Sequence, residues 1–442
     1  MNDSIRFHEL INLSDTEKQA LLKRTESDLS RYIEKIQPIL KAVKEEGDQA
    51  LARFARELDQ AELKPDSIKV DSREFDRAFE SVHKEVIEAI GFAADNIRVF
   101  HEGQMPEPLR MSEVRPGVFC GEKTNPIPSV ACYVPRGKGS FPSVVLMTTI
   151  PAVVAGVPKV CVLTPPGPDG KADDATLVAA RKAGIEEVYK CGGAQAVAAA
   201  AYGTSTIPKF DKIVGPGSPW VVAAKRLLAD EIDPGTPAGP SESIIFADPT
   251  ADGRLAALDL IIESEHGPDS SAFLVTNSRQ VADRAMEAIP DYWQSLGETR
   301  REFSSAVLGG PNGGILLASD ENACIEFINA YAPEHLMIHS REPFQYLGAI
   351  KHAGEILLGE NTPLSLGNYV LGPNAVLPTS AAARIHSPLG VHDFLKKTGI
   401  GYVTSVAYDL LAKHAHTLAV YEGFDGHALA VSELRKKLKF DG

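Results

Sequence analysis

The fold is decided by residues 159–202, KVCVLTPPGPDGKADDATLVAARKAGIEEVYKCGGAQAVAAAAY. Two short apolar runs in this stretch, Lys159–Thr164 and Glu187–Lys190, each end at a glycine or proline turn and precede an alanine-rich segment. This order is typical of strand, turn and helix in a βαβ unit. Two more runs, Ser129–Val134 and Lys212–Val214, flank it at intervals of roughly 25 to 30 residues, about one such unit. The region predicts a domain with a parallel sheet.

A second series of short apolar runs follows and alternates with helical segments. The runs are Ser243–Ala247, Ala272–Thr276, Gly314–Ala318, Leu336–His339 and Glu355–Leu358. They predict another α/β layer, which we expect the N-terminal helices to complete. Between the two series, the glycine- and proline-rich residues 235–240 suit a domain hinge.

Both ends of the chain predict helices. Near the N-terminus, apolar residues at three- and four-residue spacing indicate helices over Asp15–Gln37, stopped by Pro38, and over Ile39–Leu58. The last fifty residues predict an amphipathic helical tail that packs on another surface.

Composition excludes several classes of protein. The 442 residues are 44% apolar and 24% charged, as in globular proteins, and carry a net charge of −14 without a Lys/Arg block. A phosphate backbone would be repelled, so we expect no nucleic-acid partner. Residues 141–157, the longest apolar stretch, contain two prolines and predict no membrane span. The five cysteines form no CxxC motif and favour reduced thiols in a cytoplasmic protein.

Glycine turns follow two of the predicted strands. Gly192-Gly193 precedes an alanine-rich helix, and Gly215-Pro216-Gly217 precedes a helix over 220–230. Turns at the carboxyl ends of parallel strands can present helix N–H groups to a phosphate. Neither is a full GxGxxG motif, and a tight turn without a ligand explains each equally well.

Two pairs of polar residues are candidates for chemistry. Glu263 and His266 lie three apart at the end of a predicted helix over 255–266, a known metal-ligand spacing, although a solvated Glu and a capping His are commoner. Glu334 and His335 lie in a loop before a strand and could supply a water activator and a general base if both face a cleft; surface exposure is the alternative.

Eight motifs in this order resemble the histidinol dehydrogenase family over nearly the whole chain after residue 25. They are CYVPRG (132–137), GGAQA (192–196), VGPG (214–217), AGPSE (238–242), SEH (264–266), APEHL (332–336), VLPT (376–379) and EGFDGH (422–427).

The resemblance implies an α/β fold of two incomplete Rossmann-like domains with parallel sheets, plus helical terminal extensions. The expected boundaries are an N-terminal extension over 1–27, a first domain over 28–132 plus 244–388, a second, NAD-binding domain over 133–243, and a dimer-crossing tail over 389–442.

The resemblance also implies a homodimeric enzyme that uses Zn²⁺ and two NAD to oxidise a primary alcohol through an aldehyde to a carboxylate. Glu334 would activate water, and His335 would be the general base. NAD contacts would be Tyr133, Gln195 and Ser218, and metal ligands would be Glu263, His266, Asn368 and His427. Substrate contacts would be Ser241, Glu263, His266, His335, Asn368, Glu422 and His427, with the tail supplied by the partner subunit.

Four positions depart from the family pattern. Glu263 replaces a Gln and Asn368 replaces an Asp, so the summed charge of the metal ligands is kept and we expect the metal to be retained. Ser218 replaces an Asn, and Ala375 replaces a substrate-binding His. The chain therefore predicts a dehydrogenase for another small alcohol, with true histidinol dehydrogenase, a sulfopropanediol dehydrogenase-like enzyme and a non-catalytic metal- or nucleotide-binding descendant as alternatives.

Overall fold

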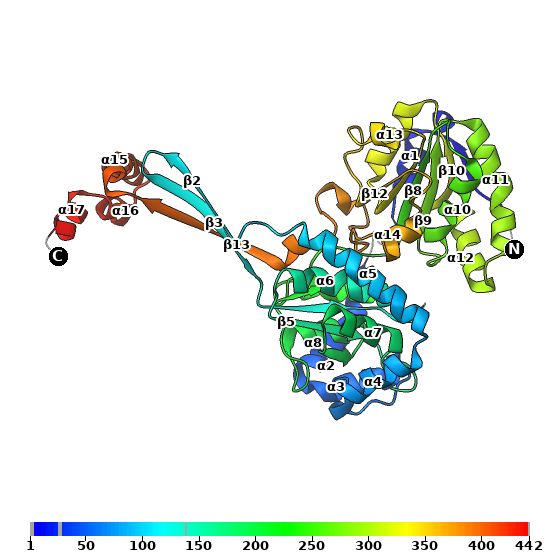
Figure 1. Ribbon diagram of the computed structural model, residues 1–442, viewed down its shortest axis with the longest axis horizontal. Helices are drawn as coiled ribbons and strands as arrows, with labels where there is room; N and C mark the ends of the chain where they lie inside the picture. The colour runs from blue at the N-terminus through cyan, green and yellow to red at the C-terminus, as the bar shows by residue number, and fades with distance from the viewer. Residues whose placement is uncertain (1–3, 25–28, 138, 441–442) are drawn as a thin grey trace. The chain divides into compact units, whose positions relative to one another are not determined.

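The structure is a computed structural model that describes residues 4–24, 29–137 and 139–440. The chain divides into two compact units, one formed by residues 1–105 with 127–394 and the other by residues 106–126 with 395–442. The larger unit contains two parallel sheets, and Figure 1 labels some of their strands and helices. The expected α/β fold with parallel sheets is therefore confirmed.

The first sheet has six strands, all parallel. Their order is β1 (Phe7–Glu9), β10 (Gly313–Leu317), β9 (Ser271–Thr276), β8 (Glu242–Ala247), β11 (His335–His339) and β12 (Glu355–Leu358). Alternate residues of each strand face opposite sides, so in β8 Ile245 joins one buried cluster and Phe246 the other.

Helices cover both faces of this six-stranded sheet. One face packs against α10 (Gly253–Ser264), α11 (Arg279–Gln294), α12 (Glu298–Leu308) and α14 (Leu364–Tyr369). The other packs against α1 (Asp15–Leu21), α13 (Glu321–Tyr331) and the 3-10 turn η4 (Pro343–Tyr346). Burial on both faces explains why most residues of these strands are apolar.

The second sheet has four parallel strands. Their order is β6 (Val188–Lys190), β5 (Lys159–Thr164), β4 (Ser129–Tyr133) and β7 (Lys212–Val214). One buried cluster joins this sheet to α2 (Ser30–Glu46), α3 (Asp48–Leu58), α8 (Gly193–Tyr202) and α9 (Pro219–Leu227). The remaining helices that pack together beside it are α4 (Ser72–Ser81), α5 (Lys84–Glu102), α6 (Pro142–Val154) and α7 (Asp174–Ala183).

The N-terminal residues do not follow the expected domain boundaries. Helices α2 and α3 pack on the four-stranded sheet, whereas the expectation joined residues 28–132 to the second strand series. The extension over 1–27 is not wholly helical, because β1 pairs with β10 as a sixth strand. Pro38 does not end a helix but lies inside α2. The helix continues because Ile36, Leu40 and Val43 bury its apolar face.

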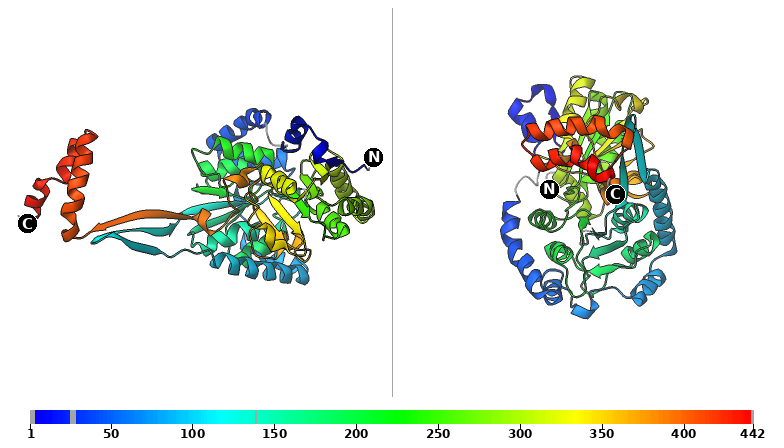
Figure 2. Two further views of the ribbon diagram at one scale, coloured as in Figure 1. Left: turned by 90° about the horizontal axis from the view of Figure 1, so that it is seen from above. Right: turned by 90° about the vertical axis from the view of Figure 1, so that its left-hand side faces the viewer.

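The smaller unit contains a structure that the sequence did not predict. Strands β2 (Leu109–Arg115), β3 (Val118–Pro126) and β13 (Leu395–Val403) form an antiparallel sheet, with β3 in the middle. Helices α15 (Ser405–Tyr421), α16 (Asp425–Ala430) and α17 (Glu433–Phe440) follow β13 (Figure 2). The expected helical tail over 389–442 is therefore wrong for its first part, because β13 pairs with β3 along its whole length.

Several short 3-10 turns complete the secondary structure. They are η1 (Leu10–Asn12), η3 (Pro65–Ser67), η5 (Ala382–Arg384) and η6 (Val391–Phe394). Within the described ranges, every helix is too short or too polar to cross a bilayer. The described cysteines are all free thiols, and four of the five are buried.

Candidate active site

Glu334 and His335 are buried side by side at the amino end of β11. Glu334 follows Ala332, whose left-handed backbone (φ 52°) ends α13, and Pro333. The Glu334 carboxylate accepts a hydrogen bond from the backbone N–H of Glu242 at 2.8 Å. Its other oxygen lies 3.8 Å from Nε2 of His335. The alternative of surface exposure is thereby excluded, and the pair has the geometry of an acid and a base that act on one reacting group.

A third buried side chain contacts this pair. Nδ1 of His335 lies 3.0 Å from Oε2 of Glu355, the first residue of the neighbouring strand β12. Burial raises the pKa of Glu334. Burial alone would lower the pKa of His335, but the carboxylates of Glu334, Glu263 and Glu355 outweigh it and raise that pKa. These carboxylates therefore stabilise the imidazolium that forms when His335 takes up a proton.

The residues expected to bind a metal are partly brought together. Glu263 is buried in the last turn of α10, and its Oε1 accepts a hydrogen bond from Nδ2 of Asn368 at 2.8 Å. Nδ1 of His266 lies 3.0 Å from the Ile262 carbonyl and 3.4 Å from Oε2 of Glu263. Although burial disfavours a charge on Glu263, the nearby His266 and His335 and the hydrogen bonds of Asn368 and Ser241 hold its pKa below its usual range.

These donors fit a divalent cation in part. A His whose Nδ1–H is held by a carbonyl keeps Nε2 free, as in many metal-ligating histidines, and Asn368 can offer its amide oxygen by rotation about its terminal bond. The described residues contain no cluster of three or more His, Cys, Asp or Glu arranged for a metal ion. The larger unit alone therefore supplies three ligands, one carboxylate, one imidazole and one amide, which is one fewer than the four of a closed zinc site.

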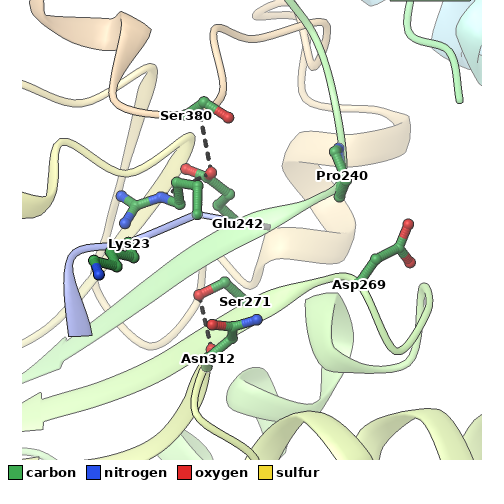
Figure 3. Close-up of a pocket in the computed structure, with 8 residues that line it drawn as sticks. Lys23, Pro240, Glu242, Asp269, Ser271, Asn312 and Ser380 are labelled. Atoms are coloured by element: carbon green, nitrogen blue, oxygen red, sulfur yellow. Dashed lines mark hydrogen bonds and ion pairs between the residues drawn. The ribbon is translucent and has the colours of Figure 1, made fainter. Parts of the chain in front are cut away.

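Glu242 and Arg24 support the buried pair of Glu334 and His335, and neither was singled out as a site residue from the sequence. Arg24 donates from Nε to Oε1 of Glu242 at 2.8 Å, and its guanidinium lies 3.3 Å from the centre of the Tyr331 ring. The same oxygen of Glu242 accepts the backbone N–H of Ser380 at 2.9 Å. Figure 3 shows this contact in a small pocket beside the amino ends of β8 and β9. The ion pair between Arg24 and Glu242 therefore fixes Glu242, whose backbone N–H donates to the Glu334 carboxylate.

The residues expected to contact NAD lie at the carboxyl ends of the four-stranded sheet. The Tyr133 hydroxyl accepts the N–H of Gly193 at 3.1 Å. Gln195 is buried in the first turn of α8, and its Oε1 has no hydrogen-bond partner among the described residues. Ser218 is the N-cap residue of α9, but its side chain makes no capping hydrogen bond. An unpaired buried amide beside a helix N-terminus is suited to a bound polar ligand.

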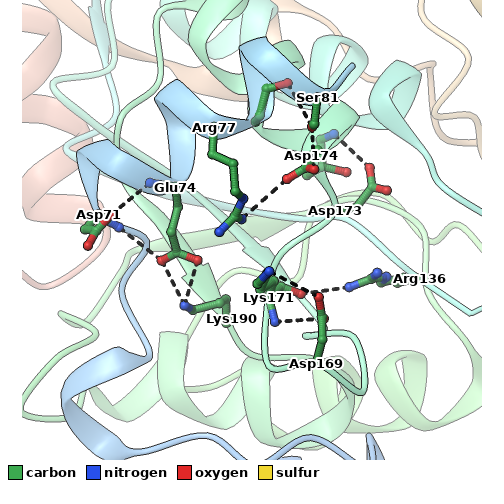
Figure 4. A network of polar contacts seen from close by, with 12 residues as sticks. Asp71, Glu74, Arg77, Ser81, Arg136, Asp169, Lys171, Asp173, Asp174 and Lys190 are labelled. Atoms are coloured by element: carbon green, nitrogen blue, oxygen red, sulfur yellow. Dashed lines mark hydrogen bonds and ion pairs between the residues drawn. The ribbon is translucent and has the colours of Figure 1, made fainter. Parts of the chain in front are cut away.

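The two glycine turns of this sheet are fixed by close contacts. Gly215 adopts φ 109°, and a Cβ there would lie 2.1 Å from the Tyr133 carbonyl oxygen, so a larger residue is excluded. Lys225, buried in α9, donates to the Gly215 carbonyl at 2.8 Å, and burial lowers its pKa to about 8. Lys190, at the end of β6, donates to both carboxylate oxygens of Glu74 (Figure 4). Both lysines hold the strand ends where the turns begin.

The remaining candidates lie elsewhere. Glu422 and His427 belong to the smaller unit, where both side chains are exposed. Ala375 follows the buried Asn374, whose Nδ2 donates to the Met147 carbonyl at 2.6 Å, so its loop is anchored. Arg384, in the 3-10 turn η5 that follows this loop, is exposed and donates to the Ala330 carbonyl at 2.6 Å.

The comparison with known proteins identifies the family. A sequence profile of the family described as histidinol dehydrogenase matches residues 22–435. The chain belongs to the histidinol dehydrogenase family. It is 60% identical to histidinol dehydrogenase homolog 2 of Mesorhizobium japonicum and 57% identical to a histidinol dehydrogenase homolog of Colwellia psychrerythraea, each over 98% of both chains.

Proteins named histidinol dehydrogenase, without the word homolog, are also similar to this chain. The histidinol dehydrogenase of Synechocystis is 46% identical over 97% of this chain and 98% of its own. The crystal structure of histidinol dehydrogenase from Elizabethkingia anophelis is similar with a TM-score of 0.91 and 33% identity, covering 98% of this chain and 99% of that one. Membership of this family makes the chain an oxidoreductase acting on CH–OH groups.

Proposed function

We propose that the chain is an NAD- and zinc-dependent dehydrogenase that oxidises a small primary alcohol through an aldehyde to a carboxylate. The observation that carries the proposal is the buried pair of Glu334 and His335, in which the Glu242 N–H holds the carboxylate and Glu355 holds the imidazole. A sensor or scaffold descended from the family would have no need to bury such a pair, since burying charged groups costs stability.

The two oxidations need two proton acceptors. In the first, Nε2 of His335 takes the hydroxyl proton as the alcohol carbon loses a hydride. In the second, Glu334 takes a proton from the water that adds to the aldehyde, which leaves the hydrate as an anion; this anion then loses a hydride to give the carboxylic acid, and the acid loses a proton to become the carboxylate. When bound, NAD would accept the hydride in each step and Zn²⁺ would act as a Lewis acid.

Glu263, His266 and Asn368 would hold the metal together with His427, and the substrate would contact Ser241, His335 and Glu422. The support is the buried Glu263, whose pKa its neighbours hold below its usual range, beside a His266 whose Nδ1 contacts the Ile262 carbonyl. We assign NAD to a Rossmann-like domain built on the four-stranded sheet, with Tyr133, Gln195 and Ser218 near it. Its support is the unpaired Oε1 of Gln195.

We further propose a homodimer in which the smaller unit brings Glu422 and His427 to the partner's site. That unit exposes many large apolar side chains, among them Val406 at 93% and Tyr421 at 90%. Such a surface is typical of one that another chain covers. The buried free thiols agree with a cytoplasmic enzyme, and a charge of −14 argues against a nucleic-acid partner.

The substrate of the proposed enzyme differs from histidinol. Ala375 lacks the polar side chain that the family places before Val376–Thr379, and Asn368 moves the negative charge of the ligand set to Glu263. The loss of one hydrogen bond to a polar substrate group costs about 1 to 3 kcal/mol, roughly 5- to 150-fold in rate. Amino alcohols, polyols and sulfonated diols are the candidates.

The test is NADH formation by the purified, zinc-loaded protein with histidinol beside a panel of those three classes. We expect a member of the panel to be oxidised with a higher kcat/KM than histidinol, and Ala375→His to raise the histidinol value. A wild-type kcat/KM for histidinol of about 10⁴ M⁻¹s⁻¹ or more would show instead that the chain is a true histidinol dehydrogenase. No turnover with any alcohol would favour a non-catalytic descendant.

A further inference from the structure

Glu355 faces His335 because of the pairing of two strands. His335 and Glu355 are the first residues of β11 and β12 and lie opposite each other in the parallel register. The backbone N–H of Glu355 donates to the Glu334 carbonyl at 2.9 Å, which fixes this register next to the catalytic pair. Side chains opposite each other in a sheet project from the same face, so the carboxylate meets the imidazole.

The carboxylate has little freedom to lie elsewhere. A Cβ on Gly367 of α14 would lie 3.1 Å from Oε1 and 3.2 Å from Oε2 of Glu355, which is tighter than ordinary packing. The absence of a side chain at Gly367 therefore makes room for the carboxylate. On its other side, Nδ1 of His335 lies 3.0 Å from Oε2. Glu355 is confined between the helix and the imidazole.

Stability alone does not account for this residue. Glu355 is buried at 8% exposure, and its Oε1 has no hydrogen-bond partner among the described residues. A buried carboxylate with an unsatisfied oxygen is unfavourable for folding. Strand β12 needs only the backbone of this residue for its pairing, so an apolar side chain would serve the sheet better. The contact that this carboxylate does make is to Nδ1 of His335.

We propose that Glu355 is a positioning residue for the catalytic base: it accepts a hydrogen bond from Nδ1–H of His335 and so keeps Nε2 directed toward Glu334 and the substrate. The inference rests on the proposed role of His335. Only a protonated Nδ1 can donate to a carboxylate, so the contact selects the tautomer whose Nε2 can take a proton. It also fixes the ring against rotation, and the negative charge stabilises the imidazolium formed when Nε2 is protonated.

A second histidine of the same strand provides a matched control. His339, four residues along β11, is buried, and its Nε2 lies 2.9 Å from Oδ2 of Asp259 on α10. This pair has the same chemistry and burial but lies at the other end of the strand. Asp259→Asn therefore removes the charge from a buried His–carboxylate contact, as Glu355→Gln does, without touching Glu334 or His335.

The experiment compares Glu355→Gln, Glu355→Ala and Asp259→Asn in the full-length, metal-loaded protein. With the best alcohol of the panel, Glu355→Ala should lower kcat roughly 10- to 100-fold while KM changes little. Glu355→Gln, which keeps an acceptor oxygen and the volume, should lose less, and added formate should partly restore Glu355→Ala. Asp259→Asn should lower thermal stability and leave kcat near the wild-type value.

A second readout does not depend on turnover. The ring ¹⁵N signals of histidine-labelled protein, assigned to His335 with the His335→Gln variant, should show a protonated Nδ1 that is lost in Glu355→Ala. An unchanged His335 signal, a kcat within about twofold of wild type, or an equal kcat loss in Asp259→Asn would overturn the proposal. If the wild-type protein turns over no alcohol, the proposed function fails, whereas the ¹⁵N signals still decide whether Glu355 holds His335.

Discussion

The imidazole of His335 lies among the carboxylates of Glu334, Glu263 and Glu355, which together raise its pKa against the effect of burial. A group with this pKa holds a proton well once it has taken one. Burial, in contrast, disfavours the charged form of Glu334 and raises its pKa, so it can become a stronger base than an exposed carboxylate. The two residues are thus suited to different proton transfers.

Separate variants should separate the two half-reactions. We expect His335→Asn to slow alcohol oxidation about 10²- to 10⁴-fold, because the hydroxyl proton loses its acceptor. Glu334→Gln should mainly impair oxidation of the aldehyde, because water activation is lost, and aldehyde should accumulate. Both are measured by supplying alcohol and aldehyde separately and following NADH together with trapped aldehyde. Rates equal to wild type for both substrates in both variants would contradict the two roles.

The pair of site residues that are neighbours in the chain was easier to predict than the residues that contact the pair from distant parts of the chain. Glu334 and His335 are neighbours in the chain, so the pattern alone indicated a possible acid–base pair, and the structure confirms that both are buried together. Glu355 follows 20 residues later as a single acidic residue at the start of a strand. Its role depends on the register between β11 and β12, which cannot be predicted from the sequence of either strand alone. Arg24 is 218 residues from Glu242 and carried no local signal either.

Among the secondary-structure elements, α10 brings two of the expected metal ligands together at its C-terminal end. Glu263 lies in its last turn and His266 just after its end, with Oε2 of Glu263 3.4 Å from Nδ1 of His266, and the following loop returns the chain to β9. The helix ends near the amino end of the six-stranded sheet, the same end as Glu334 and His335. The negative end of its dipole adds to the attraction for a cation there.

Metal content should therefore depend on this helix end. The purified protein is expected to hold about one Zn²⁺ per chain, and His266→Ala should lose both metal and turnover, because one of two imidazole ligands is gone. Metal analysis by mass spectrometry measures this, with His392→Ala as control, since His392 is an exposed histidine of η6. Protein that contains no divalent metal and keeps its activity with a chelator would refute the assignment.

Element boundaries were predictable where a strand is buried on both faces. The expected bounds of β5, β7 and β12 match the structure, because each is an apolar run closed by a turn. Strand β2 could not be recognised in this way, because all seven of its residues are exposed. Strand β13 pairs with β3, which lies far earlier in the chain, so its pairing is not a local property.

For the whole molecule, the shared site of the proposed dimer leads to a test by subunit mixing. His266→Ala and His427→Ala chains should each be inactive alone. In a mixed dimer, one site would carry both defects and the other neither, so random exchange should restore about one quarter of wild-type activity. Activity is measured after refolding the two variants together, with tagged chains to verify exchange. Verified mixed dimers without activity would show that His427 does not serve the partner's site.

The assignment of chain segments to domains was the least predictable feature. Helices α2 and α3 precede the four-stranded sheet by more than seventy residues, and their amphipathic pattern would suit either sheet. In the structure these helices pack on the four-stranded sheet, where Leu40, Leu51 and Phe54 belong to the same buried cluster as residues of β4 and β5. An amphipathic pattern states that a face is buried but not against what.

The pairing of β1 with β10 also has a consequence for synthesis of the chain. Phe7 leaves the ribosome first among the strand residues, but its partner Ile315 is made about three hundred residues later. At roughly 5 to 20 residues per second, β1 must wait on the order of 15 to 60 seconds for its neighbour. The helices and strands of the four-stranded sheet are all translated in that interval. The first strand of the protein is therefore among the last to be paired, and it is exposed to chaperones and to misfolding until then.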